Sequence, residues 1–391
     1  MSIYISKQLS GVGPSLIREI FKYAADPGVI SMSAGNPDPN SLPISAISEI
    51  MREIAANDLN LALGYSVSEG YPPLRELLKT HLAAQECFRA GQDDLIVTSG
   101  SQQGIDFVCR ALTDPGDRII VEAPSFTGSL NCFRSHGLEM RELPIEPDGI
   151  CPDKLEAALK QDSRVRFIYL IPNFQNPTGY TMSRVKRAAV YEIANRYGIP
   201  ILEDDPYGDL RFEGEDIPAI KTLDKSGLVI YLRSFSKVLA AGIRVGYFSF
   251  PAELLGPLTV AKQANDVHTG MLSQLVCHRF LSEYEMSAHL DKIASVYRQK
   301  YACMAEALSA LPGEKLSFSP VQGGLFVWCR LEDGSDAAAL ALRLVQEKKV
   351  AVVPGVAFYS SGRVSPHIRL TFATPTPEQI KKGVAAIGEI L

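Results

Sequence analysis

Between Asp94 and about residue 250, the chain alternates short apolar runs with longer segments of helical periodicity. The runs read DLIVTSG, RIIVEAP, RFIYLIP, IPILEDD, GLVIYLRSFSK and VGYFSF. Strands that are apolar at nearly every position suit a parallel sheet that helices cover on both faces. We therefore predict an α/β fold whose large domain contains a mainly parallel, doubly wound sheet.

The flanking segments predict a second, smaller unit. Helical periodicity marks residues 14–25, 44–56 and 72–86, and it dominates again after about residue 252, with a long stretch over roughly 273–311. The strands GGLFVWC, VAVVPG and HIRLTFA then mix with helices, which is typical of an α+β domain. A chain of 391 residues is long for one core. We expect an N-terminal segment (1–45) that packs with the small domain and the active site, a large domain (46–285) and a small C-terminal domain (286–391).

Composition excludes several classes of function. The net charge is −5 and the chain has no basic run, so we expect no nucleic-acid or membrane partner. The seven cysteines form no CxxC pair, and the six histidines form no motif with Cys, Asp or Glu, so we expect neither a disulfide framework nor a bound metal. The N-terminus does not resemble a signal peptide and no apolar run approaches eighteen residues, so we expect a cytoplasmic protein.

Lys237 follows one of the buried strands, within LRSFSKVLAAGIRVGY. Ser234, Ser236 and Arg244 lie close to it in sequence and could donate hydrogen bonds to a phosphate group. A lysine beside such a group could form a Schiff base with an aldehyde, and nearby positive charge would lower its pKa. Taken alone, the same pattern also suits a surface lysine.

Two further strand ends carry polar residues. NPTG, with Asn176, follows FIYLIP, and ILEDDPY ends in acids and in Tyr207. Ligands of open α/β sheets bind at the carboxyl ends of the strands, so we expect these side chains to converge with Lys237. A carboxylate there could pair with a pyridinium nitrogen, and Asn176 and Tyr207 could bond a ring oxygen. Glu203, Asp204 and Asp205 compete for the carboxylate role.

The chain resembles the fold-type I pyridoxal-phosphate enzymes, specifically the class I/II aminotransferases, and within them the 2-aminoadipate, kynurenine and aromatic aminotransferases. The resemblance spans nearly the whole chain. Its motifs occur in family order: GYSVSEGYPPLR, TSGSQQGID, APSF, PNFQNPTG, EDDPY, SFSKVLAAGIRVGY, GGLFVW and HIRLTFA. Together they are far more specific than any one of them.

The resemblance implies pyridoxal 5'-phosphate as cofactor. Lys237 would hold it covalently and move a proton, Asp204 would keep the pyridine nitrogen protonated, and Asn176 and Tyr207 would bond the 3-oxygen. The remaining cofactor-binding residues that the resemblance implies are Ser101, Gln102, Phe126, Ser234, Ser236 and Arg244. Where the family often has a tyrosine after APS, this chain has Phe126, which keeps ring stacking but has no hydroxyl.

The resemblance further implies a homodimer with shared active sites, because Tyr65 would reach the phosphate in the neighbouring subunit. Arg369 would bind the substrate α-carboxylate in a two-pronged pair, near Asn176. Ser33, Gly35 and Asn36 would approach the same pocket.

The substrate side chain is less constrained by these motifs. Arg18 could meet a side-chain carboxylate, or it could be a solvated arginine on an amphipathic helix. The implied reaction is ping-pong transfer of an amino group from an aromatic, 2-aminoadipate-like or glutamate-like L-α-amino acid to a 2-oxo acid such as 2-oxoglutarate.

Two alternatives remain at this stage. A pyridoxal-phosphate lyase could use the same scaffold. A non-catalytic regulatory domain could share the fold behind a DNA-binding module, but the resemblance begins by about residue 14, so we expect no such module.

Overall fold

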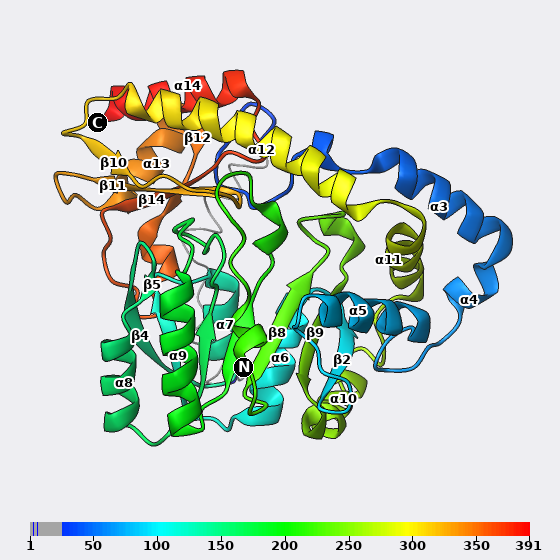
Figure 1. Cartoon of the computed structure of the whole chain (residues 1–391). Helices are drawn as coiled ribbons and strands as arrows, with labels where there is room; N and C mark the ends of the chain where they lie inside the picture. The colour runs from blue at the N-terminus through cyan, green and yellow to red at the C-terminus, as the bar shows by residue number, and fades with distance from the viewer. Residues whose placement is uncertain (1–2, 4–5, 7–25) are drawn as a thin grey trace.

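The computed structural model describes residues 3, 6 and 26–391. An eight-stranded sheet fills the lower half of the view (Figure 1). β9 and β5 run antiparallel to their neighbours, and the other strands point the same way, as predicted for a mainly parallel sheet. In spatial order the strands are β2 (Asp93–Thr98), β9 (Gly246–Pro251), β8 (Val229–Ser234), β7 (Ile201–Asp204), β6 (Val165–Leu170), β3 (Arg118–Ala123), β4 (Glu139–Glu146) and β5 (Gly149–Ile150).

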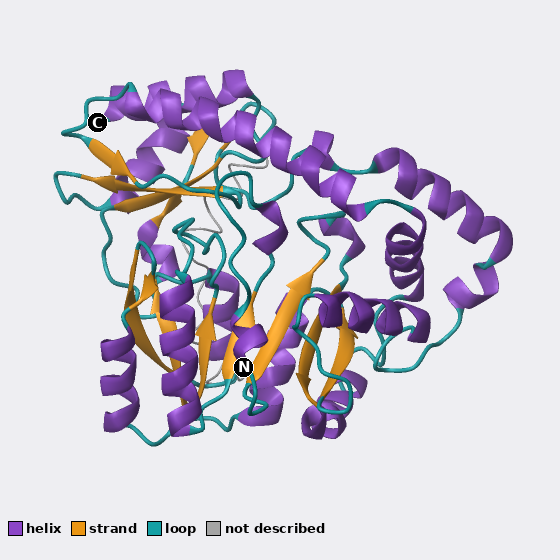
Figure 2. Cartoon of the chain, in the orientation of Figure 1, coloured by secondary structure: helices purple, strands orange, loops and turns teal. Residues whose placement is uncertain are grey.

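Helices cover both faces of this sheet, and its central strands are accordingly buried at nearly every position (Figure 2). In β6, Ile168 packs in the core cluster that also contains side chains of α8 and α9. The next residue, Tyr169, points to the opposite face and packs edge-on against Phe133 of α7, with ring centroids 5.3 Å apart. The covering helices are α6 (Ser101–Leu112) and α7 (Thr127–Ser135) on one face, and α8 (Pro152–Gln161) and α9 (Arg184–Tyr197) on the other.

β4 and β5 do not follow the apolar-run pattern that predicted the other strands of this sheet. Along β4, exposed or half-buried residues surround the single buried residue Leu143. The strand lies near the edge of the sheet, between β3 and the two-residue β5, so solvent reaches much of it. An edge position therefore explains why a search for continuous apolar runs does not detect it.

A second, antiparallel sheet of four strands lies above the first one in Figure 1, beneath α12 and α14. The expected strand VAVVPG divides into two short strands that belong to different sheets, since β12 pairs with β1 near the N-terminus and β13 pairs with β14. The elements of this part are β1 (Ile30–Ser31), β10 (Leu316–Phe318), β11 (Phe326–Leu331), β12 (Val350–Ala351), β13 (Val353–Pro354), β14 (His367–Thr371), α12 (Met286–Ser309), α13 (Ala337–Glu347) and α14 (Pro377–Ile390).

The long helical stretch expected over 273–311 is two helices, α11 (Met271–Glu283) and α12. Tyr284, between them, has extended backbone angles. Its ring stacks on Phe280 at 5.4 Å, and its hydroxyl donates a hydrogen bond to Glu49 of α3. These contacts stabilise the turn at which the chain changes direction between α11 and α12.

The remaining helices lie at the right of Figure 1 or connect strands. They are α3 (Ile44–Asn57), α4 (Leu59–Leu63), α5 (Pro72–Ala84) and α10 (Leu255–Gln263), with short 3₁₀ helices η1 (Pro39–Ser41), η2 (Gly208–Leu210), η3 (Ile220–Leu223), η4 (Ala241–Ile243), η5 (Ala252–Leu254) and η6 (Gly355–Phe358). Within the described ranges, none of the helices has the length and apolar character that crossing a bilayer requires.

Candidate active site

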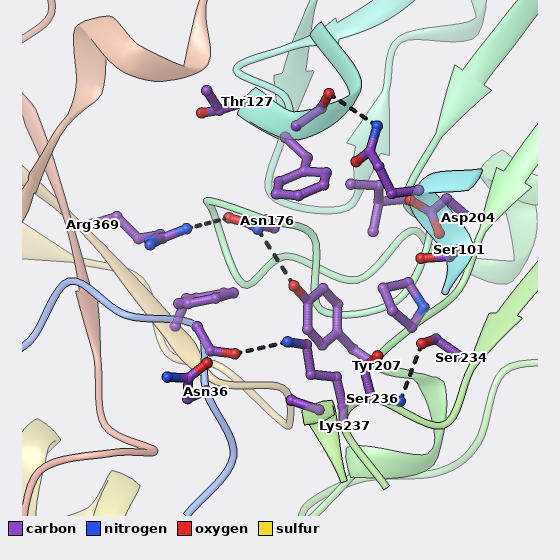
Figure 3. Close-up of a pocket in the computed structure, with 18 of the residues that line it drawn as sticks. Asn36, Ser101, Thr127, Asn176, Asp204, Tyr207, Ser234, Ser236, Lys237 and Arg369 are labelled. Atoms are coloured by element: carbon purple, nitrogen blue, oxygen red, sulfur yellow. Dashed lines mark hydrogen bonds between the residues drawn. The ribbon is translucent and has the colours of Figure 1, made fainter. Parts of the chain in front are cut away.

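A cavity of about 690 Å³ opens at the carboxyl ends of the parallel strands, between the large sheet and the second sheet. Side chains from segments far apart in sequence meet there (Figure 3). The residues predicted from sequence that line it are Gly35, Asn36, Ser101, Gln102, Phe126, Asn176, Asp204, Tyr207, Ser234, Ser236, Lys237, Arg244 and Arg369.

Lys237 extends into this cavity from the loop after β8. Its Nζ donates a 2.8 Å hydrogen bond to the backbone oxygen of Gly35 (Figure 3). Burial, together with the positive charges of Arg244 and Arg369, lowers the pKa of Lys237 to about 8. More of this amine is therefore uncharged near neutral pH than of an ordinary lysine, which favours a nucleophilic role.

Asp204 is the last residue of β7 and is almost completely buried. Tyr169 of β6 donates a 2.7 Å hydrogen bond to its Oδ2, and Ser129 of α7 donates a 2.7 Å hydrogen bond to the Tyr169 hydroxyl. Oδ1 has no hydrogen-bond partner in the described structure. Burial and then the charge of Asp205 raise the pKa of Asp204 to about 7, against the lowering effect of Tyr169.

Glu203 and Asp205, the acidic residues on either side of Asp204, have different partners. Glu203 is buried and accepts hydrogen bonds from the backbone NH groups of Ile220 and Lys221. Asp205 forms a 3.0 Å ion pair with Arg233. Of the three acids, Asp204 is the one that lines the cavity.

Asn176 joins two other predicted residues. Its amide nitrogen donates a 3.4 Å hydrogen bond to the Tyr207 hydroxyl, and its Oδ1 accepts a 2.8 Å hydrogen bond from Arg369 (Figure 3). Burial raises the pKa of Tyr207, so this hydroxyl keeps its proton and can donate it in a hydrogen bond. The three side chains therefore form one connected polar group on the cavity wall.

The guanidinium of Arg369 lies over the rings of Phe326 and Phe358, at 4.2 Å and 5.0 Å from their centroids. Nη2 donates a 2.5 Å hydrogen bond to the backbone oxygen of Ser33, and Nε is buried with no partner among the described residues. Burial lowers the pKa of Arg369 to about 10, which still leaves the group charged at neutral pH. An unpaired donor on a buried cation favours an anionic ligand.

A group of donors lies where α6 begins. Ser101 is the first residue of this helix, so backbone NH groups and the positive end of the helix dipole face the cavity. Nη1 of Arg244 donates a 3.1 Å hydrogen bond to Oγ of Ser236. The backbone NH of Ser236 donates a 3.1 Å hydrogen bond to Oγ of Ser234.

Gly100 precedes this helix with φ +87°, and a Cβ there would overlap the Arg244 guanidinium. Both facts require glycine at this position.

Phe126 is half-buried at the start of α7 and lines the cavity. The preceding loop comes from β3, so this aromatic ring lies on the same wall as Gln102, whose amide donates a 3.1 Å hydrogen bond to the backbone oxygen of Gly128. Its position is consistent with the expected stacking surface for a flat ring.

Two predicted residues are not part of this arrangement. Tyr65 does not line the cavity; its side chain is 92% exposed and meets only the edge of His268 at a ring distance of 5.7 Å among the contacts described for it. Arg18 lies outside the described residues.

Sequence reasoning missed several residues that contribute to the site. Tyr169 orients Asp204, and alternation along β6 could have identified the face on which it lies. The other missed residues that line the cavity are Thr127, Gly128, Asn131, Ile171, Pro206, Ala241, Phe326, Val353 and Phe358. Phe326, Pro206 and Ala241 lie within the motifs GGLFVW, EDDPY and SFSKVLAAGIRVGY, whereas the others lie outside the quoted motifs.

The absence of a bound metal stays a prediction from the sequence, but the structure brings three metal-ligating side chains together. Cys109, Cys132 and His136 bring their ligand atoms within 4.8 Å of one another. The first two lie on α6 and α7, so no short sequence motif joins them.

These residues fit a phosphorylated pyridine aldehyde. The unpaired Oδ1 of buried Asp204 suits a protonated ring nitrogen, and the helix start with Arg244 suits a phosphate. Lys237 supplies an amine with a lowered pKa on the same cavity wall.

Comparison with known proteins supports this assignment. The model of the family "Aminotransferase class I and II" matches residues 27–387. The chain is 35% identical over 392 residues to aromatic-amino-acid aminotransferase 1 of Thermococcus litoralis, covering 99% of this chain and 94% of the relative. It is 36% identical over 380 residues to 2-aminoadipate transaminase of Thermus thermophilus, covering 96% and 94%.

Among solved structures, kynurenine aminotransferase of Pyrococcus horikoshii has a TM-score of 0.94 at 34% identity, covering 99% of this chain and 96% of that one. That protein was crystallised in complex with PMP, with KYN as substrate and KYA as product. The chain described here belongs to the class I and II aminotransferases and is a pyridoxal-phosphate-dependent transaminase.

Proposed function

We propose that this transaminase moves the amino group of an aromatic, 2-aminoadipate-like or glutamate-like L-α-amino acid to a 2-oxo acid such as 2-oxoglutarate, by a ping-pong mechanism. The convergence of Lys237, Asp204 and Arg369 on one cavity is the observation that carries the proposal. The names of the relatives support the substrate classes, since they include an aromatic-amino-acid aminotransferase and a 2-aminoadipate transaminase.

Lys237 is the proposed catalytic amine. When bound, pyridoxal phosphate supplies an aldehyde that takes up the amino group and a protonated ring that withdraws electrons. Lys237 would hold this group covalently between turnovers, and its Nζ would move a proton to and from the α-carbon of the substrate. The lowered pKa of Lys237 supports this role, because the uncharged amine accepts that proton.

Asp204 is the proposed partner of the ring nitrogen. Its Oδ1 is free in the described structure and its Oδ2 is held by Tyr169, so the carboxylate has one oriented oxygen left for a cation. A positive charge at Oδ1 would favour the ionised carboxylate against the effect of burial. Asn176 and Tyr207 would donate hydrogen bonds to the ring 3-oxygen, which their connected positions support.

The phosphate would lie at the start of α6. Ser101 and Gln102 would bind it from the helix, and Ser234, Ser236 and Arg244 from the loop after β8. Phe126 would stack on the face of the cofactor ring.

Arg369 is the proposed anchor for the substrate α-carboxylate. Its Nε is unpaired, and Phe326 and Phe358 shield the guanidinium from water. Shielding strengthens an ion pair at this position. Gly35 and Asn36 would line the substrate side, because they belong to the N-terminal segment that reaches the cavity. The role of Arg18 in binding a side-chain carboxylate remains a proposal based on sequence.

The test is an absorption titration of the purified protein. Addition of L-glutamate should convert the band of the lysine-bound cofactor into that of the amine form, and 2-oxoglutarate should restore it. If an aromatic amino acid converts the cofactor to the amine form and L-glutamate does not, the amino donor is an aromatic rather than a glutamate-like amino acid. Consumption of the amino acid with return of the lysine-bound band in the absence of any 2-oxo acid, and without accumulation of the amine form, would contradict transamination and favour a lyase.

We propose a homodimer with shared active sites. Apolar side chains are exposed along α3, α4 and the following loop, and exposed apolar groups that gather in one region are typical of protein–protein contact surfaces. These residues are Ile44, Met51, Leu59, Leu61, Leu63, Tyr65 and Val67. Light scattering of the purified protein would test this proposal. A molar mass equal to two chains would support the homodimer, and the mass of a single chain would contradict it.

Sharing of the sites has its own test. Tyr65→Ala and Lys237→Ala chains should each be nearly inactive. Mixed after unfolding and refolding together, they should regain activity, because a mixed dimer contains one site with an intact Lys237 and the partner subunit's Tyr65. No recovery despite mixed dimers would contradict a shared site.

We also propose a cytoplasmic location and the division into 1–45, 46–285 and 286–391. All seven cysteines, each within the described part of the chain, are free thiols, which suits a reducing compartment. The separation of the eight-stranded sheet from the four-stranded sheet supports a boundary between a large and a small unit. Cell fractionation and limited proteolysis would test these points.

A further inference from the structure

A cluster of thiol and imidazole groups lies between α6 and α7, apart from the residues that line the cavity. Cys109 comes from α6, Cys132 from α7, and His136 caps the end of α7. Their ligand atoms all lie within 4.8 Å of one another. Cys109 is buried and His136 is half-buried, so the cluster lies just beneath the surface.

Asp106 orients the histidine of this cluster. It precedes Cys109 by three residues, which places both on the same side of α6. Oδ1 of Asp106 lies 2.7 Å from Nε2 of His136, and Oδ2 accepts a 2.7 Å hydrogen bond from Arg110. With Nε2 bonded to this carboxylate, Nδ1 is the ring nitrogen of His136 that remains for a metal, which would displace its proton.

We propose that Cys109, Cys132 and His136 bind a divalent cation of zinc-like softness. Two thiolates and one imidazole are ligands that Zn²⁺ prefers, and three protein ligands leave a fourth position for water. Metal–ligand bonds of about 2.0–2.3 Å require donor atoms roughly 3.5–4 Å apart, so the side chains need only a small adjustment. A carboxylate on the second nitrogen of a ligating histidine is a regular feature of zinc sites.

The proposed metal would link the two helices whose first turns line the cavity. Ser101 and Gln102 begin α6, and Thr127 and Gly128 begin α7. A metal that binds the folded state alone raises its stability. Zn²⁺ should therefore raise the melting temperature, whatever the identity of the amino donor.

The experiment uses the cofactor-loaded protein, in a non-thiol reductant, titrated with Co²⁺ and then with Zn²⁺. Tetrahedral Co²⁺ bound by thiolates should give intense visible bands and a thiolate charge-transfer band, at one ion per chain, and Zn²⁺ should remove both. Co²⁺ bound to oxygen groups near the cofactor phosphate would give neither feature.

Variants test the ligands separately. Cys132→Ser and His136→Asn should abolish the charge-transfer band or reduce it strongly, while the cofactor absorption confirms that they fold. Asp106→Asn should keep all three ligands and weaken Zn²⁺ binding by about 10- to 100-fold. Cys303→Ser, at a half-buried cysteine of α12, is the matched control and should bind as the wild type does.

The proposal is overturned if the wild type shows no thiolate-to-Co²⁺ band, or if Cys132→Ser binds Co²⁺ with the same spectrum and affinity. An Asp106→Asn affinity equal to that of Cys303→Ser would remove the assigned role of the carboxylate.

Discussion

The hydroxyl of Tyr169 donates a 2.7 Å hydrogen bond to Oδ2 of Asp204, whereas Oδ1 of the same carboxylate has no partner in the described part of the chain. One oxygen is thus fixed by the protein and the other is free for a ligand. Ser129 in turn donates to Tyr169, which holds that hydroxyl in a single orientation. This chain of donors makes Tyr169 a positioning residue for the proposed cofactor partner.

Tyr169→Phe should lower kcat by about 10- to 100-fold, the effect expected from losing a hydrogen bond to a charged group of about 1.5–3 kcal/mol. Without this donor, the pKa of Asp204 should rise further above its ordinary value. Steady-state kinetics and the pH dependence of the cofactor spectrum would measure both effects. Tyr191→Phe, at a buried tyrosine of α9, is the control and should leave both unchanged. A Tyr169→Phe enzyme with normal kcat and an unshifted spectrum would exclude the positioning role.

Lys237→Ala should reduce kcat by at least about 10²-fold, because it removes the amine that moves the proton. The cofactor should still bind through the start of α6 and Arg244, but without the absorption band of the lysine-bound form. Single-turnover kinetics and spectra would detect both changes, and the exposed Lys225→Ala would serve as control. Near-normal turnover by Lys237→Ala would refute its catalytic role.

Arg369→Lys should raise KM for the amino acid by about 10- to 100-fold, with a smaller change in kcat. Lysine keeps the charge but cannot form a two-pronged pair with a carboxylate, and it lacks the flat surface that packs on Phe326 and Phe358. Initial rates over a range of donor concentrations would separate the two constants. Arg330→Lys, at an exposed position of β11, should behave as the wild type. An unchanged KM would indicate that the α-carboxylate binds elsewhere.

Glu122→Gln should make the cofactor-free protein less sensitive to pH. Glu122 is buried in β3, its Oε1 has no partner within the described structure, and burial raises its pKa from 4.5 to about 8. Between these two values the folded state holds a proton that the unfolded state has released, so stability falls as pH rises, by about 1.4 kcal/mol per pH unit at most. Urea unfolding from pH 5 to pH 8 would measure this slope.

The glutamine variant cannot ionise, so its stability relative to the wild type should increase as pH rises through this window. Glu142→Gln, at a half-buried glutamate of β4, is the comparison and should keep the wild-type slope. Equal slopes in Glu122→Gln and the wild type would show that Glu122 does not titrate in this range.

Much of the large sheet could be predicted from the sequence, because its central strands lie between two layers of helices and must be apolar on both sides. β4 could not be predicted in this way, since it lies near the edge of the sheet, is partly solvated and has no continuous apolar run. At the break between α11 and α12, Tyr284 contacts Glu49, which lies on a helix distant in sequence. Local periodicity contains no information about such a contact.

The sequence by itself determined the family, the large sheet and most of the residues around the cavity, because these residues follow strand ends within recognisable motifs. Only the tertiary structure decided that Tyr169 and Ser129 support Asp204, and that Cys109, Cys132 and His136 meet between two helices. The physical reason is that a sequence motif identifies only residues that are close to one another along the chain. The partners of a buried polar side chain are instead set by which faces of separate strands and helices pack together, and burial makes those partnerships strong.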